Sequence, residues 1–72
     1  MANDEAMLRL RIATMLPELN ERQRRLYLAT EAKAIGYGGV TRVSRISGIS
    51  RVTINLGLNE LDDNTANNDE II

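Results

Sequence analysis

Apolar residues recur at helical spacing near the start of the chain. Counted from Leu8, they fall at i, i+4, i+7 and i+8, the positions that share one face of a helix. Pro17 disfavours helical geometry at the residue before it, so the pattern predicts that the first helix covers residues 4–16.

A second apolar stripe predicts a helix over residues 21–35. Asn20 can cap the first turn of this helix, and Gln23 can reach back to the Asn20 backbone N–H, which together make a capping box. Gly36 can take the left-handed conformation that ends a helix.

Two short helices are predicted next, over residues 40–47 and 51–61, with a turn between them. Gly48 can adopt a positive φ in this turn without a Cβ penalty. Ser50 can accept a hydrogen bond from the N–H groups that open the following helix. Two short helices around a central glycine are typical of a helix-turn-helix.

No stretch of the sequence alternates between apolar and polar residues as a strand would. The predicted fold class is therefore all-α, a small bundle of about four helices that contains a helix-turn-helix. Residues 1–61 are expected to form this domain. Residues 62–72 are acidic and polar, and they are expected to be a disordered tail or linker.

The composition excludes several kinds of chemistry. The 72 residues contain no cysteine and no histidine, which removes disulfides, thiolate and imidazole metal ligands, and the usual side chains of nucleophilic or general-base catalysis. We therefore expect no enzymatic activity, no cofactor, no metal site and no small-molecule substrate. Tyr27 and Tyr37 are the only aromatic residues, so the core is expected to be aliphatic.

No apolar stretch of the sequence is long enough to cross a membrane. The longest, residues 7–16, is interrupted by Arg9 and Arg11 and falls far short of the roughly 20 residues that a spanning helix needs. We expect no membrane partner and a cytoplasmic location.

Charge is segregated along the chain, although the total is only −1. Residues 20–58 carry a net charge of +5, whereas residues 59–72 carry five acidic side chains and no basic one. A basic middle segment fits a polyanionic partner such as nucleic acid, and it also fits an ordinary solvated surface. The acidic end is typical of a separate tail.

The residues around the predicted turn each have a physical role in a helix-turn-helix. Val43 and Ile46 are placed to face the core. The small side chains of Ser44 and Ser47 let the two helices approach closely. Ile49 is placed to bury the turn against the domain. This arrangement leaves the front of the last helix facing outward, where it can enter the major groove of DNA.

Side chains on this outward face suit base recognition. Arg51 can pair with guanine O6 and N7, and Asn55 can pair with adenine N6 and N7. Hydroxyl groups at the start of the helix can bind phosphate or a base edge, and basic residues on the preceding helix can lie over the DNA backbone. The candidate residues for binding double-stranded DNA are Arg42, Arg45, Ser50, Arg51, Val52, Thr53 and Asn55.

Residues 19–61 resemble a known family. The resembling segments are LNERQRRL, EAKAIGYGGV, VSR, SGISR and GLNEL. In these segments the chain is similar to the N-terminal region of the Rhodopirellula-type DDE transposases of bacterial insertion sequences. The resemblance implies a helix-turn-helix that recognises the ends of its own element during transposition, a form of DNA recombination. In the family a separate catalytic domain holds divalent metal, and no residue here is assigned to that role.

Asn55 and Leu56 stand where the family usually carries basic residues, which removes roughly two phosphate contacts. One alternative is therefore a decayed transposase fragment with little DNA affinity. Another is a protein-interaction or oligomerisation module, since the first helix carries more apolar residues than one face needs. In that case residues 4–16 form a homodimer contact; otherwise they complete the core of the monomer.

Overall fold

Four α-helices make up the described part of the chain. The computed structural model describes the backbone of residues 2–71 and the side chains of residues 5–63. The helices are α1 (Ala2–Met15), α2 (Glu21–Ile35), α3 (Gly39–Ser47) and α4 (Arg51–Ile71), with a short 3-10 helix, η1 (Leu16–Glu18), after α1. No strand occurs within residues 2–71, so the predicted all-α class is confirmed.

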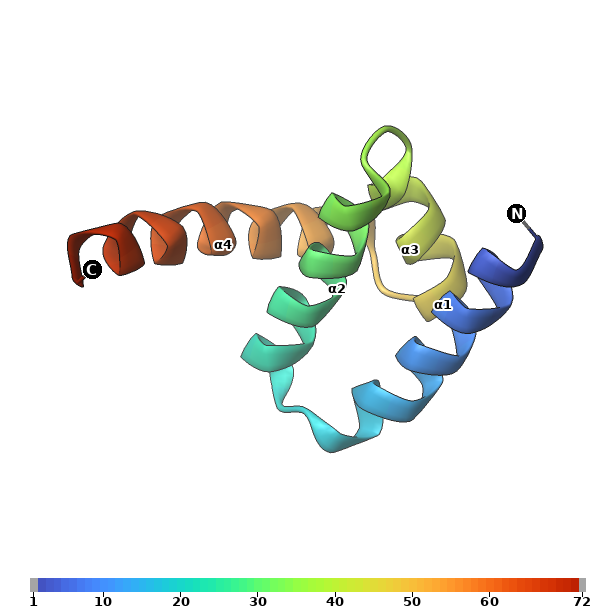
Figure 1. The fold of residues 1–72 in the computed structure, drawn as a ribbon. Coiled ribbons are helices and arrows are strands. Elements are labelled where there is room, and N and C mark those ends of the chain that lie inside the picture. The colour runs from blue at the N-terminus through green and yellow to red at the C-terminus, as the bar shows by residue number, and fades with distance from the viewer. Residues whose placement is uncertain (1, 72) are drawn as a thin grey trace.

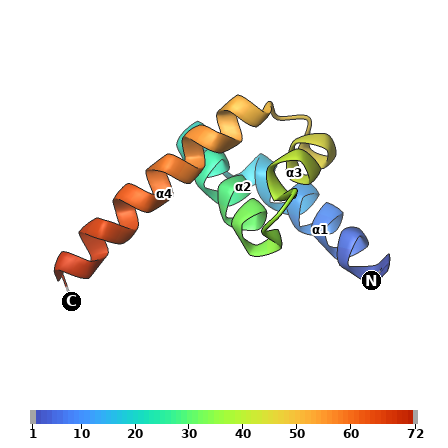
Figure 2. The ribbon, with the colours of Figure 1, turned by 90° about the horizontal axis from the view of Figure 1, so that it is seen from above.

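The first three helices pack together, and α4 crosses α2 and then extends away from them (Figure 1). Seen from above, the front of α4 lies beside α2 and α3, while its far end projects beyond the other helices (Figure 2). The front of α4 therefore lies against α2 and α3.

The start of α2 matches its prediction in detail. The Gln23 N–H donates to Asn20 Oδ1 at 2.9 Å, and the Asn20 N–H donates to Gln23 Oε1 at 3.0 Å. This reciprocal pair is the predicted capping box. At the other end, Gly36 follows the last helical residue with φ of 85° and ψ of −128°, so it ends the helix with a positive φ but outside the left-handed helical conformation that was predicted.

The end of α4 differs from its prediction. We expected this helix to stop at residue 61, but α4 continues to Ile71, through the segment expected to be a disordered tail. Asn and Asp lower helix propensity by less than about 1 kcal/mol each, and no Gly or Pro after Gly57 ends the helix. The side chains of residues 64–72 lie outside the described residues, so a division between residues 1–61 and 62–72 stays a prediction.

The core is aliphatic, as the composition predicts. Its largest fully buried side chains are those of Leu28, Val43 and Ile54, one from each of α2, α3 and α4. Leu8 and Ile12 bring α1 onto the same core. Half-buried apolar residues surround it, and they are Leu16, Tyr27, Ile35, Val40, Ile46 and Ile49.

Gly57 lets α4 lie directly on the backbone of α2. A Cβ at this position would overlap the Arg25 carbonyl oxygen and would come within 3.1 Å of the Ala29 Cβ. Any larger residue would therefore push the two helices apart. Gly39 plays the same role at the start of α3, where a Cβ would overlap the Ala32 carbonyl.

Two arginine–carboxylate pairs tie the helices together. Arg11 of α1 donates from Nε and Nη2 to the two carboxylate oxygens of Glu31 on α2, at 2.7 and 3.0 Å. The Tyr27 hydroxyl donates to the same carboxylate at 2.9 Å. Arg25 of α2 makes a similar bidentate pair with Glu60 on α4, with hydrogen bonds of 2.9 and 3.0 Å to the two carboxylate oxygens.

Gly57→Ala tests the close approach of α4 to α2. Alanine improves intrinsic helix propensity by about 1 kcal/mol, but overpacking against a backbone carbonyl typically costs about 1–3 kcal/mol. We expect a net loss of unfolding free energy in urea denaturation followed by circular dichroism. Asn59→Ala is the matched control on the exposed side of α4 and should not destabilise the protein. Equal stability of the two variants would contradict the packing described here.

Glu31→Gln tests the ion pair between α1 and α2. The hydrogen bonds from Arg11 and Tyr27 hold the pKa of Glu31 below its usual 4.5, against the opposing effect of burial. A carboxyl whose pKa is lowered by folding stabilises the protein above its unfolded pKa, and this contribution is lost as the pH falls through the folded pKa.

We therefore expect wild-type stability to fall as the pH drops below about 4.5. Glu31→Gln should lower stability by about 1 kcal/mol at pH 7, because Arg11 is half exposed and solvent weakens the pair. The variant should also lose less stability in acid. The measurement is urea denaturation at a series of pH values, with Glu18→Gln as an exposed control. Identical acid profiles for wild type and Glu31→Gln would rule out this role.

Candidate nucleic-acid interface

The turn between α3 and α4 is held by two serines of α3. Gly48 adopts the left-handed conformation with φ of 77°, as predicted. The Ser44 hydroxyl donates to the Ile49 carbonyl at 2.7 Å, and the Ile49 N–H donates to the Ser47 hydroxyl at 3.1 Å. The sequence pattern indicated only that these serines are small enough for the two helices to approach closely. Their position just before a glycine turn was the signal that they also bind the turn backbone.

The first turn of α4 is capped by Ser50, as predicted. The Thr53 N–H donates to Ser50 Oγ at 3.2 Å, and the two hydroxyl groups lie 3.0 Å apart in a second hydrogen bond. This bonding satisfies one of the N–H groups left without a partner at the start of the helix. Both hydroxyls predicted to contact DNA are thus already engaged in positioning the front of α4.

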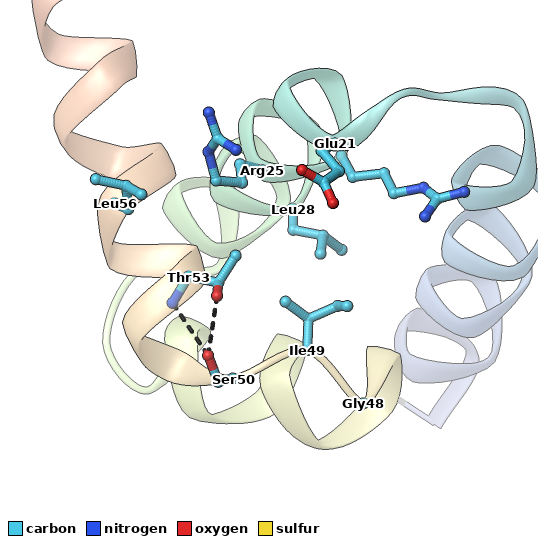
Figure 3. Close-up of a pocket in the computed structure, with 9 residues that line it drawn as sticks. Glu21, Arg25, Leu28, Gly48, Ile49, Ser50, Thr53 and Leu56 are labelled. Carbon is cyan, nitrogen blue, oxygen red and sulfur yellow. Dashed lines mark hydrogen bonds between the residues drawn. The ribbon is translucent and has the colours of Figure 1, made fainter.

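A groove of about 420 Å³ lies between α2 and the front of α4. Leu28, Ile49 and Thr53 gather at its centre, and Ser50 is joined to Thr53 at its edge (Figure 3). Arg24 and Arg25 also line the groove. Their guanidinium groups are bound within the protein, because Arg24 donates to the Leu16 carbonyl at 2.8 Å and Arg25 binds Glu60. The groove is therefore mainly apolar at its centre.

The outward face of α4 carries the predicted reading residues. Arg51, Val52 and Asn55 are exposed, and so are Leu56 and Asn59. Val52 is 78% exposed and Leu56 is 50% exposed. The opposite face holds Ile54 and Gly57 against the domain. The predicted outward orientation is confirmed, and the face combines one cation, two amides and two aliphatic side chains.

Arg42 and Arg45 lie elsewhere. Arg45 donates to Glu5 of α1 at 3.2 Å, and Arg42 lies at a shallow depression that Arg11 and Glu31 also line. Successive helical residues are about 100° apart, so these arginines are on the flank of α3 opposite Ser44 and Ser47, which face the turn. The structure does not bring Arg42 and Arg45 together with the outward face of α4, and their contact with DNA stays a prediction.

Much of the basic middle segment is paired within the molecule. Glu60, which binds Arg25, also has its Oε2 atom 3.9 Å from Arg22 Nε. Lys33 Nζ lies 3.9 Å from Asp62 Oδ1. The Arg25 guanidinium, bound to Glu60, holds the pKa of that carboxyl below its usual range. Within the part of the chain whose side chains are described, neither Arg42 nor Arg51 is joined to an acid. The net charge of +5 therefore overstates the positive surface that a partner meets.

No group of three or more acidic side chains among residues 5–63 is arranged to hold a metal ion. No helix within residues 2–71 has the length and apolar character needed to cross a membrane. Comparison of the chain with models of protein families, with curated proteins and with solved structures gives no match.

Ser50→Ala tests the cap that positions the front of α4. Loss of a serine cap typically costs about 1 kcal/mol, because an N–H at the helix start loses its partner. We expect Ser50→Ala to lower stability by this amount in urea denaturation, whereas Ser50→Asp, which can accept the same bond, should retain wild-type stability. If both substitutions destabilise the protein equally, the hydroxyl of Ser50 does not act as a cap.

Proposed function

We propose that residues 39–59 form a helix-turn-helix that binds double-stranded DNA, with the outward face of α4 in the major groove. The observation that carries this proposal is the exposed set of side chains at the front of α4, directly after a tight, hydrogen-bonded turn. An α-helix with its side chains is about 10–12 Å across, close to the roughly 12 Å width of the groove.

The chemistry of this face suits base edges. The Arg51 guanidinium can donate two hydrogen bonds to guanine O6 and N7. The Asn55 amide can donate to adenine N7 and accept from N6. Both side chains are exposed and lie within the first two turns of α4, the part of a recognition helix that meets the bases.

The fold supports this role by fixing the direction in which α4 faces. Gly57 packs on the α2 backbone, and Glu60, on the same side of α4, accepts two hydrogen bonds from Arg25. Both contacts turn the opposite side, with Val52, Asn55 and Asn59, into solvent. A reading face held in place before binding avoids part of the ordering cost of association.

The electrostatics favour base recognition over general attraction to phosphate. Most of the cations in residues 20–58 are bound to acids or carbonyls of the protein. If the surface neutralises one or two phosphates, a plot of the logarithm of the binding constant against the logarithm of the salt concentration should have a slope of about −1 to −2. Neutralisation of five phosphates would give a slope of about −4 to −5.

The resemblance to transposases narrows the proposed DNA target to the terminal sequences of an insertion element. Recognition of such ends would assign the chain to transposition and DNA recombination. A cytoplasmic location belongs to the same proposal. A decayed fragment of this family, with little DNA affinity, is the corresponding alternative, and Asn55 and Leu56 in place of basic residues favour it.

A protein-interaction module is the second candidate function. Met7 is 50% exposed and Leu10 is 57% exposed, and both lie on the side of α1 away from the core. These side chains do not complete the monomer core, which favours a homodimer contact within residues 4–16. Sedimentation over a concentration series distinguishes a homodimer from a monomer. If residues 4–16 form the contact, the protein should dimerise at high concentration, and Leu10→Asp should abolish the dimer.

The proposed function is tested by selecting a duplex from a randomised pool with the purified chain and measuring its affinity by fluorescence anisotropy. Arg51→Ala and Asn55→Ala should each cost about 1–3 kcal/mol on the selected duplex. Arg9→Ala, which removes an exposed arginine of α1 that pairs with Glu5, is the matched control and should change affinity little. Failure to enrich any duplex, or an equal loss for Arg9→Ala, would contradict the proposal.

A further inference from the structure

Two aliphatic side chains stand exposed on the proposed reading face. Val52 is 78% exposed, and Leu56, one helical turn further on at i+4, is 50% exposed at the edge of the groove between α2 and α4. Asn55 and Asn59 lie on the same face. Base edges contribute hydrogen-bonding groups that amides can read, but an aliphatic side chain needs an apolar partner.

In the major groove of DNA, the apolar group offered by the four bases is the C5-methyl of thymine. Resting on the proposed function, we infer that Val52 and Leu56 recognise thymine methyl groups. The preferred partner is then a duplex with thymines at two positions, beside the adenine that Asn55 reads. No other side chain of this face supplies that contact.

The spacing of the two residues sets the spacing of the thymines. Four helical residues advance by about 6 Å along the axis, and successive bases on one strand are about 3.4 Å apart. Val52 and Leu56 therefore reach methyl groups about two base steps apart when α4 lies along the groove. Asn55 lies between them in sequence, so its adenine falls within the same short stretch.

Acidic residues limit how far along α4 this contact extends. Asp62 and Asp63 are exposed one turn beyond Asn59, where they would repel the phosphates at the groove edge. The reading surface is thus confined to residues 51–59. A protein partner is disfavoured on the same face, because two aliphatic side chains separated by amides offer far less than the roughly 800 Å² per partner of a stable protein interface.

The test uses the duplex recovered by selection, synthesised once with thymidine and once with deoxyuridine, which lacks only the methyl group. Burial of one methyl group changes affinity by about fourfold, so two contacts predict roughly a tenfold or greater loss on the deoxyuridine duplex. The double variant Val52→Ala/Leu56→Ala should lose most of this preference, because the shortened side chains bury less of each methyl group. Tyr37→Ala removes an exposed side chain from the loop between α2 and α3 and should keep the wild-type ratio.

Each outcome is decisive. Equal binding of the two duplexes by the wild type would overturn the inference but leave DNA binding in place. A preference that the double variant retains would assign the effect to DNA shape, which would also overturn it. Failure to enrich any duplex would overturn both the inference and the proposed function. Circular dichroism of the variants checks that the substitutions at these exposed positions leave the helices intact.

Discussion

The direct contact between α4 and the backbone of α2 determines where the front of α4 lies and which of its side chains face outward. Gly57 packs on the Arg25 carbonyl, so the two helix axes come as close as their backbones allow. The same arginine then reaches across to Glu60, one turn further along α4. One residue of α2 thus fixes both the distance and the rotation of α4. That rotation buries Ile54 and exposes Val52 and Asn55.

The contacts that hold the fold also determine the charge of its surface. Arg11, Arg22, Arg25, Lys33 and Arg45 lie near carboxylates from other helices, and Arg24 binds a carbonyl. Their attraction for a polyanion is reduced because each already has a partner in the protein. The outward face of α4 instead carries amide and aliphatic groups. In the proposed function, discrimination between sequences therefore depends on base contacts more than on phosphate contacts.

The sequence predicts the local structure well and the long-range pairing poorly. Helix α2, its capping box and the glycine turn at Gly48 follow from residues at most four positions apart, and all were confirmed. The pairs Arg11–Glu31 and Arg25–Glu60 join residues 20 and 35 positions apart, which charge counting cannot detect. The length of α4 was missed because polar composition was taken as a stop signal, although a helix ends where its backbone is interrupted or capped.

For the candidate site too, the features that depend on local sequence were predicted and those that depend on long-range packing were not. The outward orientation of Arg51, Val52 and Asn55 followed from helical periodicity, which is a local property. The pairing of Arg45 with Glu5 depends on how α1 packs against α3, which no local pattern reveals.

In the proposed function, the outward face of α4 is the DNA-binding surface. The most direct test is to titrate the ¹⁵N-labelled chain with a selected duplex and to follow backbone amide shifts by NMR. We predict the largest shifts within residues 51–59 and little change around Met7 and Leu10. Shifts confined to α1, or none at all when the duplex is in excess, would contradict the claim.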